Sequence, residues 1–141
     1  RLKPWRQWLT FTMKGADAPF RSRIKNEFIP QLRKHVDNSD ADTFEREAWQ
    51  TCSEFRILIE KCIESVLLNE VLVRFRRDIQ TKGRLSKLTK IEQSDCDFID
   101  DLMTRYSVFE HSQSDEFPAL CPDLQQIEHD VDALSSWINA F

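Results

Sequence analysis

An arginine, a glutamate and a histidine in this chain form a set that can cleave RNA without a metal. Arg56 and Glu60 stand four residues apart in a helix-like segment, and His111 follows a later helix-like segment. Histidine transfers protons near neutral pH, and the planar guanidinium group of arginine matches phosphate oxygens. In such cleavage a base activates the ribose 2′-hydroxyl, an acid protonates the leaving 5′-oxygen, and a cation stabilises the charge on the phosphorane.

The same residues also have a simpler explanation. Arg56 and Glu60 lie one helical turn apart, and an ion pair of that kind on a solvated face contributes about 0.3–0.5 kcal/mol. A single histidine is more often a loop or capping residue than a catalyst. Arg105 also precedes His111 by a short interval. The spacing therefore leaves open whether Arg56 or Arg105 is the partner of His111.

A basic run lies between the two helix-like segments. Residues 74–90 carry seven Lys or Arg residues and a single acid, Asp78. Such a run can follow a phosphate backbone, and it can equally be a solvated surface that keeps the domain soluble. Its members, which are the candidate RNA-binding residues, are Arg74, Arg76, Arg77, Lys82, Arg84, Lys87 and Lys90.

Length and composition indicate one soluble, mostly helical domain. The 141 residues suit one hydrophobic core, with 40% hydrophobic and 31% charged residues. Only two glycines occur, so few turns are marked. The net charge of -4 hides a segregation, because the stretch from Glu92 to the end has twelve acids and one base. The overall charge does not indicate a nucleic-acid binder, but its distribution allows a local basic patch.

The first half of the chain predicts two helices. Apolar residues at helical spacing favour one from about Pro19 to His35, which Pro30 should kink or interrupt. The cluster of residues 37–40 is typical of a turn and a helix N-cap. A long helix should follow from about Ala41 to about Asn69, with one continuous apolar stripe.

The second half predicts a basic loop and shorter helices. Residues 76–84 read as a loop, and a short helix should follow over residues 85–91. Ser94 and Asp97 resemble a capping box for a helix that ends near Tyr106. Residues 111–122 should form a loop, and Asp123 should cap the last helix. The fold class is therefore all-α, a bundle of about five or six helices with one long central helix.

Cysteine and histidine positions argue against disulfides and metal sites. The four cysteines contain no CxxC pair, and Cys52 and Cys62 are expected to be buried thiols. The three histidines are scattered, so we expect no metal ligands in this chain. No run approaches 18 apolar residues and no signal-peptide pattern appears. A cytoplasmic protein is the simplest interpretation.

Several short motifs resemble one protein family. They are Phe55-Arg56-Ile57-Leu58-Ile59-Glu60, Leu67-Leu68-Asn69, Arg74-Phe75-Arg76-Arg77 and Tyr106-Ser107-Val108-Phe109-Glu110-His111. Together they resemble the C-terminal part of bacterial SMC-like ABC ATPases of defence and restriction loci. The similarity covers roughly residues 50–141, with a looser match before them. Members of the RloC/PrrC type are anticodon nucleases whose nuclease region carries Arg-x-x-x-Glu and a later His, and this region is grouped with the helical HEPN ribonucleases.

The resemblance implies a function, partners and a domain arrangement. Arg56, Glu60 and His111 would form the catalytic triad, although Arg105-x5-His111 also fits the usual HEPN spacing. The chain would be one domain over residues 1–141, with a HEPN-like core at 40–141 and residues 1–15 joining it to an upstream ATPase region. No phosphate-binding glycine loop occurs in this chain, so the ATPase would lie in that upstream region, which would bind ATP and magnesium.

We therefore expect a metal-independent endoribonuclease, acting on RNA and possibly on tRNA in anti-phage defence, and a homodimer. The alternative is a non-catalytic helical domain that docks a partner or dimerises the ATPase. The acidic C-terminal half and the apolar residues Trp137 and Phe141 motivate this alternative.

Overall fold

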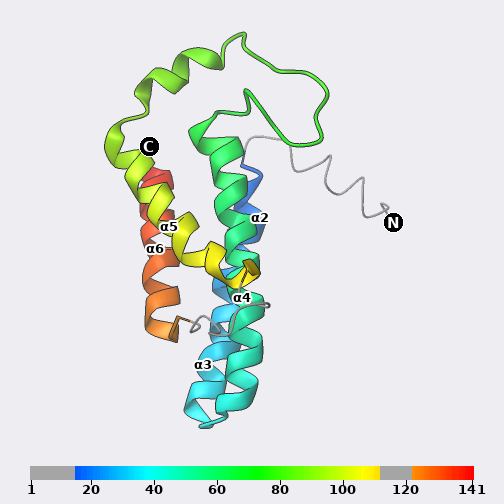
Figure 1. Cartoon of the computed structure of the whole chain (residues 1–141), viewed down its shortest axis with the longest axis vertical. Coiled ribbons are helices and arrows are strands. Elements are labelled where there is room, and N and C mark those ends of the chain that lie inside the picture. Colours follow the sequence, from blue (N-terminus) through cyan, green and yellow to red (C-terminus); the bar gives the residue numbers. More distant parts are fainter. Residues whose placement is uncertain (1–14, 112–121) are drawn as a thin grey trace.

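A long helix forms the axis of the molecule, and the other helices pack along it (Figure 1). The computed structural model describes residues 15–111 and 122–141, with the side chains of residues 108–111 outside the description. Within these ranges the structure is all-helical and contains no strand, which confirms the predicted fold class. The predicted connection over residues 1–15 lies almost wholly outside the described residues, as does most of the predicted loop over residues 111–122.

The first arm of the bundle is helical from Asp17 to Asp37. It consists of α2 (Asp17–Arg23), a π-helical turn η1 (Ile24–Phe28) and α3 (Ile29–Asp37). Pro30 lacks an N–H group, so it cannot donate to the preceding turn. Immediately before Pro30 the backbone hydrogen bonds change from the α-helical to the π-helical pattern, and the Ile29 N–H donates to the Ile24 carbonyl. Pro30 thus changes the hydrogen-bond register and leaves no gap between the helical elements.

The central helix begins as predicted and ends slightly earlier. Helix α4 (Ala41–Cys62) continues into a π-helical turn, η2 (Ile63–Leu67). The Asp40 side chain accepts a hydrogen bond from the Thr43 N–H at 3.2 Å, which confirms the predicted N-cap. At the other end Asn69 takes a positive φ of 47°, and the Leu68 N–H bonds the Ile63 carbonyl. This left-handed turn stops the helix.

An irregular segment, residues 68–84, folds back after the central helix. Backbone and side-chain bonds close it, including Gln80 N–H to the Val71 carbonyl at 3.0 Å and Asn69 Nδ2 to the Arg84 carbonyl at 3.2 Å. Gly83 takes a φ of 73°, so the predicted break occurs there. A short 3₁₀ helix, η3 (Leu85–Lys90), follows and confirms the predicted short helix.

The last two helices, α5 (Gln93–His111) and α6 (Leu124–Ala140), complete the bundle. The predicted capping box was placed two residues too late. The carboxylate of Asp95 accepts the Glu92 N–H at 2.9 Å, so the helix begins before Ser94. It also continues past Tyr106 to His111. Asp123 caps α6 as predicted, because its side chain accepts the Gln126 N–H at 2.8 Å.

The hydrophobic core lies where α4 meets the other helices. Helix α5 packs across α4, and α6 packs against both α3 and α4. The apolar stripe predicted on the central helix supplies most of this core, and Cys52 and Cys62 are fully buried as expected. The largest buried side chains are Tyr106, Phe55, Ile24, Leu32, Leu58, Ile59, Leu102, Ile127 and Leu134.

Candidate functional site

The Arg56–Glu60 pair predicted from spacing forms on α4. Arg56 Nε donates to Glu60 Oε1 at 3.1 Å, and both side chains are largely buried, at 17% and 22% exposed. The pair therefore lies beside the core rather than on an open face. Because of its low exposure, salt screens this pair less than the solvated pair that spacing alone suggests.

Arg74 joins this pair from the irregular segment. Its guanidinium group lies 2.7 Å from Glu60 Oε2 and 3.3 Å from Glu64 Oε1. The backbone N–H of Arg74 also donates to Glu64 Oε2 at 2.8 Å. Burial alone would lower the pKa of Arg74, but hydrogen bonds and the charges of Glu60 and Glu64 raise it overall. The guanidinium group stays charged, and its side chain is 52% exposed.

Lys61 adds a third cation to the group. Its Nζ lies 3.9 Å from Glu64 Oε1, and its side chain is 7% exposed. Burial lowers the pKa of Lys61, with the charge of Glu64 acting in the opposite direction. We call these five residues the ion-pair cluster: Arg56, Glu60, Lys61, Glu64 and Arg74. Three cations face two carboxylates there, so the cluster keeps an excess positive charge that suits a phosphate group.

Arg105, the rival of Arg56, faces a different helix. Its guanidinium group lies 2.7 Å from Oδ1 of Asp130 on α6, a residue that is only 2% exposed. The neighbouring Tyr106 hydroxyl donates to the other Asp130 oxygen at 2.6 Å. Arg105 thus takes part in joining α5 to α6, whereas Arg56 belongs to the ion-pair cluster on α4.

His111 is the final residue of α5, and its side chain lies outside the described residues. The position of the helix itself is defined by an edge-to-face contact between Tyr106 and Phe55, with ring centroids 4.6 Å apart. Helix α5 therefore crosses the middle part of α4 at Phe55, five residues before Glu60 along α4 (Figure 1).

The basic run divides into two groups of residues. Three of its cations have partners: Arg74 pairs with Glu60 and Glu64, Arg76 bonds the Glu70 and Val71 carbonyls, and Arg84 pairs with Glu70 at 2.8 Å. The other four cations are exposed, and no ion pair within the described residues involves them. They are Arg77, Lys82, Lys87 and Lys90. The exposed positive charge is therefore smaller than the count of seven predicts.

Sequence reasoning missed the role of Glu64 and the link from Arg74 to Glu60. Arg56, Glu60 and Glu64 recur every four residues, and that repeat marks one helix face. It was a signal that could have identified Glu64. The return of Arg74 to this face had no local signal, because it depends on how the irregular segment folds back.

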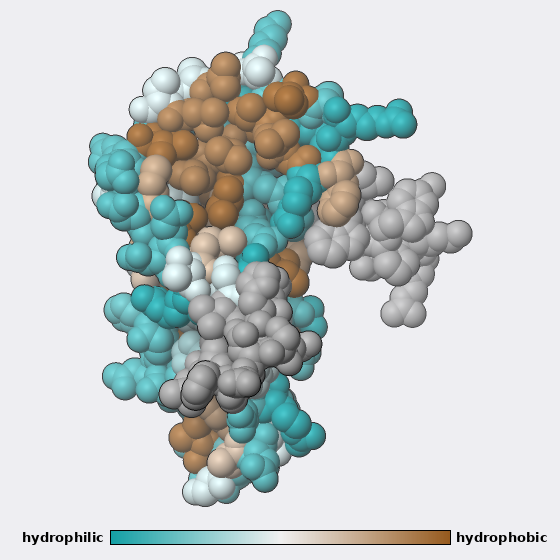
Figure 2. All heavy atoms as spheres, viewed as in Figure 1, coloured by the Kyte–Doolittle hydropathy of each residue, from teal (hydrophilic) through white to brown (hydrophobic). Residues whose placement is uncertain are grey.

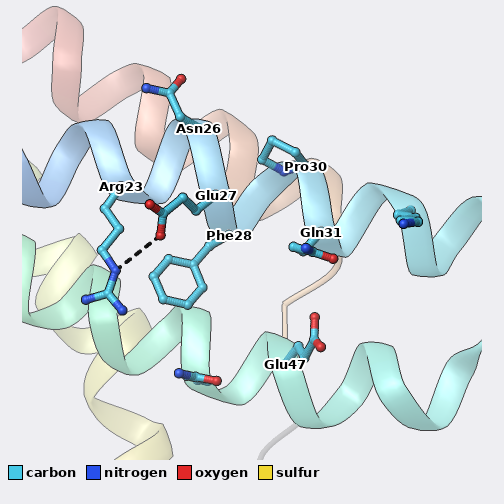
Figure 3. Close-up of a pocket in the computed structure, with 9 residues that line it drawn as sticks. Arg23, Asn26, Glu27, Phe28, Pro30, Gln31 and Glu47 are labelled. Atoms are coloured by element: carbon cyan, nitrogen blue, oxygen red, sulfur yellow. Dashed lines mark ion pairs between the residues drawn. The ribbon is translucent and has the colours of Figure 1, made fainter.

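A separate groove of about 650 Å³ lies between the first arm and α4 (Figure 3), and no residue of the ion-pair cluster lines it. Arg23 on its wall pairs with Glu27 at 3.5 Å and lies 5.1 Å from the ring centre of Phe28. A second carboxylate, Glu54, lies 4.0 Å away, so Arg23 already has anionic partners. None of the predicted site residues lines this groove.

Two further properties concern metals and membranes. Among the residues that the structure describes, no three or more His, Cys, Asp or Glu side chains gather as a metal site would require. Likewise, no helix within residues 15–111 and 122–141 combines the length and apolar character needed to cross a membrane.

The chain matches no family model, no curated protein and no solved structure in comparisons with each of these. The resemblance to SMC-like ATPases therefore stays a prediction that rests on the short motifs alone.

Proposed function

We propose that this chain is a metal-independent endoribonuclease domain that uses Arg56, Glu60 and His111. The observation that carries the proposal is the partly accessible ion-pair cluster, in which one carboxylate lies between two guanidinium groups. A carboxylate can accept the proton of a ribose 2′-hydroxyl, and adjacent arginines can hold the phosphate that it attacks.

Each residue has a distinct role in the proposal. Glu60 is the general base, and Arg56 stabilises the negative charge that develops on the phosphate. His111 is the general acid that protonates the leaving 5′-oxygen. In support, α5 carries His111 at its end and contacts α4 at Phe55, five residues before Glu60 on the same helix. The exposed cations Arg77, Lys82, Lys87 and Lys90 would guide the RNA backbone.

The wider assignment follows the resemblance to SMC-like ATPases. We propose that the domain has a HEPN-like arrangement, acts as a homodimer on RNA, possibly tRNA, in anti-phage defence, and works with an upstream ATPase region. A cytoplasmic location is part of this proposal. The described cysteines, Cys52, Cys62 and Cys96, are free thiols, as is usual in a reducing compartment.

The proposal predicts that single substitutions of the triad suppress RNA cleavage. His111→Ala and Glu60→Gln should each lower the cleavage rate by about 10²–10⁴-fold, the usual contribution of a general acid or base. Arg56→Gln should lower it by about 10²–10³-fold, because one charge-stabilising donor is lost. The measurement is the cleavage rate of end-labelled RNA by the purified chain in the presence of EDTA, with circular dichroism to check folding.

Two outcomes would contradict the assignment. Unchanged cleavage by folded His111→Ala would remove His111 from the mechanism. Loss of cleavage in Arg105→Gln, with normal cleavage in Arg56→Gln, would assign the charge-stabilising role to Arg105 and remove Arg56 from the mechanism.

A non-catalytic interaction domain is the second candidate function. One observation favours it: four large apolar residues at the end of the bundle are 49–80% exposed, namely Leu72, Phe75, Ile79 and Leu85. Figure 2 shows hydrophobic residues gathered at this end. Such a patch is typical of a surface that binds a protein, here a second copy of the chain. Under this alternative the wild-type chain leaves RNA intact.

A further inference from the structure

Arg74 reaches Glu60 although it lies fourteen residues further along the chain. Left-handed backbone at Asn69 and Glu70, with φ values of 47° and 59°, turns the chain back along the end of the central helix. Non-glycine residues rarely adopt this conformation, so the surrounding contacts must hold it in place. The turn therefore brings a guanidinium group from the irregular segment to the predicted site.

Glu64 holds both the backbone and the side chain of Arg74 in place. It accepts the Arg74 backbone N–H at 2.8 Å, and its other oxygen lies 3.4 Å from Arg74 Nε and 3.3 Å from the terminal nitrogen. Glu64 is 9% exposed, and the buried Lys61 ammonium group lies beside it. A backbone and a side-chain contact to one carboxylate define both the position and the direction of the guanidinium group.

We propose that Arg74 is a second phosphate-binding cation of the RNA-cleaving site, and that Glu64 is the residue that positions it. This inference rests on the proposed function. Arg74 is the most exposed member of its ion pairs, at 52% against 22% for Glu60 and 11% for Glu64. Its free face is therefore the part of the ion-pair cluster that an incoming phosphate meets first.

Phosphate binding would also free the base. In the unliganded site the guanidinium group of Arg74 pairs with Oε2 of Glu60 at 2.7 Å, and that of Arg56 pairs with Oε1 at 3.1 Å. A phosphate oxygen that takes over the Arg74 donor leaves Glu60 Oε2 open to the 2′-hydroxyl. Glu64 keeps Arg74 at the site during this exchange.

The reaction balances without any further reagent. The 2′-hydroxyl proton passes to Glu60 while the 2′-oxygen forms a bond to phosphorus. The bond from phosphorus to the 5′-oxygen then breaks, and His111 supplies the proton to that oxygen. The products are a 2′,3′-cyclic phosphate and a 5′-hydroxyl. Between these steps the phosphorane oxygens carry the extra negative charge, which the guanidinium groups of Arg56 and Arg74 stabilise.

Substitutions at Arg74 and Glu64 test the inference. Arg74→Gln should lower kcat by about 10²–10³-fold, as loss of one oxyanion donor does. Arg74→Lys should restore only part of the rate, because a lysine lacks the planar fork. Arg46→Gln is the matched control, since Arg46 is an exposed arginine near the other end of α4 and should leave the rate unchanged.

The role of Glu64 needs a readout that a loss of stability would not change. If Glu64 acts through Arg74, Glu64→Gln should lower kcat in the wild-type background but have little effect in Arg74→Gln. A purely structural Glu64 would lower the rate by the same factor in both backgrounds. Thermal unfolding of each variant shows whether it is folded at the assay temperature.

The outcomes separate this inference from the proposed function. Normal cleavage by Arg74→Gln, with loss of cleavage in Glu60→Gln, would overturn the role of Arg74 and leave the triad standing. Equal factors in the Glu64 comparison would overturn the positioning role. Failure of the wild-type chain to cleave RNA would overturn the proposed function and this inference together.

Discussion

Asp130 shows how a single buried carboxylate joins two helices. It is 2% exposed and accepts hydrogen bonds from Arg105 at 2.7 Å, Tyr106 at 2.6 Å and Gln126 at 3.0 Å. Burial raises the pKa of Tyr106, and the hydrogen bond to Asp130 and its charge raise it further. The tyrosine therefore keeps its proton and stays a donor to the carboxylate. Since α5 also carries His111, this contact helps to set the orientation of the helix that leads to the proposed acid.

We predict that Tyr106→Phe destabilises the fold. The substitution leaves an oxygen of the buried Asp130 carboxylate without its hydroxyl donor, which costs about 1–3 kcal/mol of unfolding free energy. Urea denaturation measures this cost. In an Asp130→Asn background the same substitution should cost less, because the buried charge is gone. Equal costs in the two backgrounds would show that the hydroxyl does not act through Asp130.

The sequence predicted the local half of the candidate site. Arg56 and Glu60 share a helix, so a spacing of four was enough to pair them. Arg74 and Asp130 contact partners that are distant in sequence, and residue spacing cannot predict such contacts. Arg105 looked equivalent to Arg56 for the same reason, since its partner on α6 is distant in sequence.

At the scale of elements, side-chain caps fix where two of the helices begin. Asp40 begins the central helix and Asp123 begins the last one, each by accepting the N–H three residues ahead. Both were predictable, because a capping aspartate and an apolar period leave a local signature. The two π-helical turns were not predictable, since the sequence pattern does not distinguish π from α register.

The Asp40 cap predicts a stability that depends on pH. Hydrogen bonds from the side chain and backbone of Thr43 hold the pKa of Asp40 below its ordinary value of 3.8. A lowered pKa in the folded state means that the stabilisation is present above about pH 4 and is lost as the pH falls through the folded value. Asp40→Asn keeps the cap without the charge, so it lacks this pH dependence.

Thermal unfolding across the acid range measures the effect. The difference in Tm between the wild-type chain and Asp40→Asn should be constant above about pH 5. Below pH 4 the Tm of the wild-type chain should fall relative to that of Asp40→Asn. A difference that stays constant down to pH 2 would contradict a cap that depends on the charge.

At the scale of the whole molecule, long-range polar contacts join the acidic helices to the first arm and to each other. Arg33 on α3 pairs with Glu128 on α6, and the indole N–H of Trp137 on α6 donates to Asp95 on α5 at 2.9 Å. The structure confirms the predicted bundle with a long central helix. This fold class was predictable, because helical periodicity and composition are visible in the sequence. The crossing of α5 over α4 at Phe55 was not predictable, because it depends on core packing between α5 and α4.

The ends of the RNA products test the central claim most directly. The purified chain is incubated with end-labelled RNA in EDTA, and the new termini are identified by their chemical groups. A 2′,3′-cyclic phosphate and a 5′-hydroxyl, both absent with His111→Ala, are the predicted result. Uncut RNA, or products with a 5′-phosphate and a 3′-hydroxyl, would contradict cleavage by the 2′-hydroxyl and with it the roles of Arg56, Glu60 and His111.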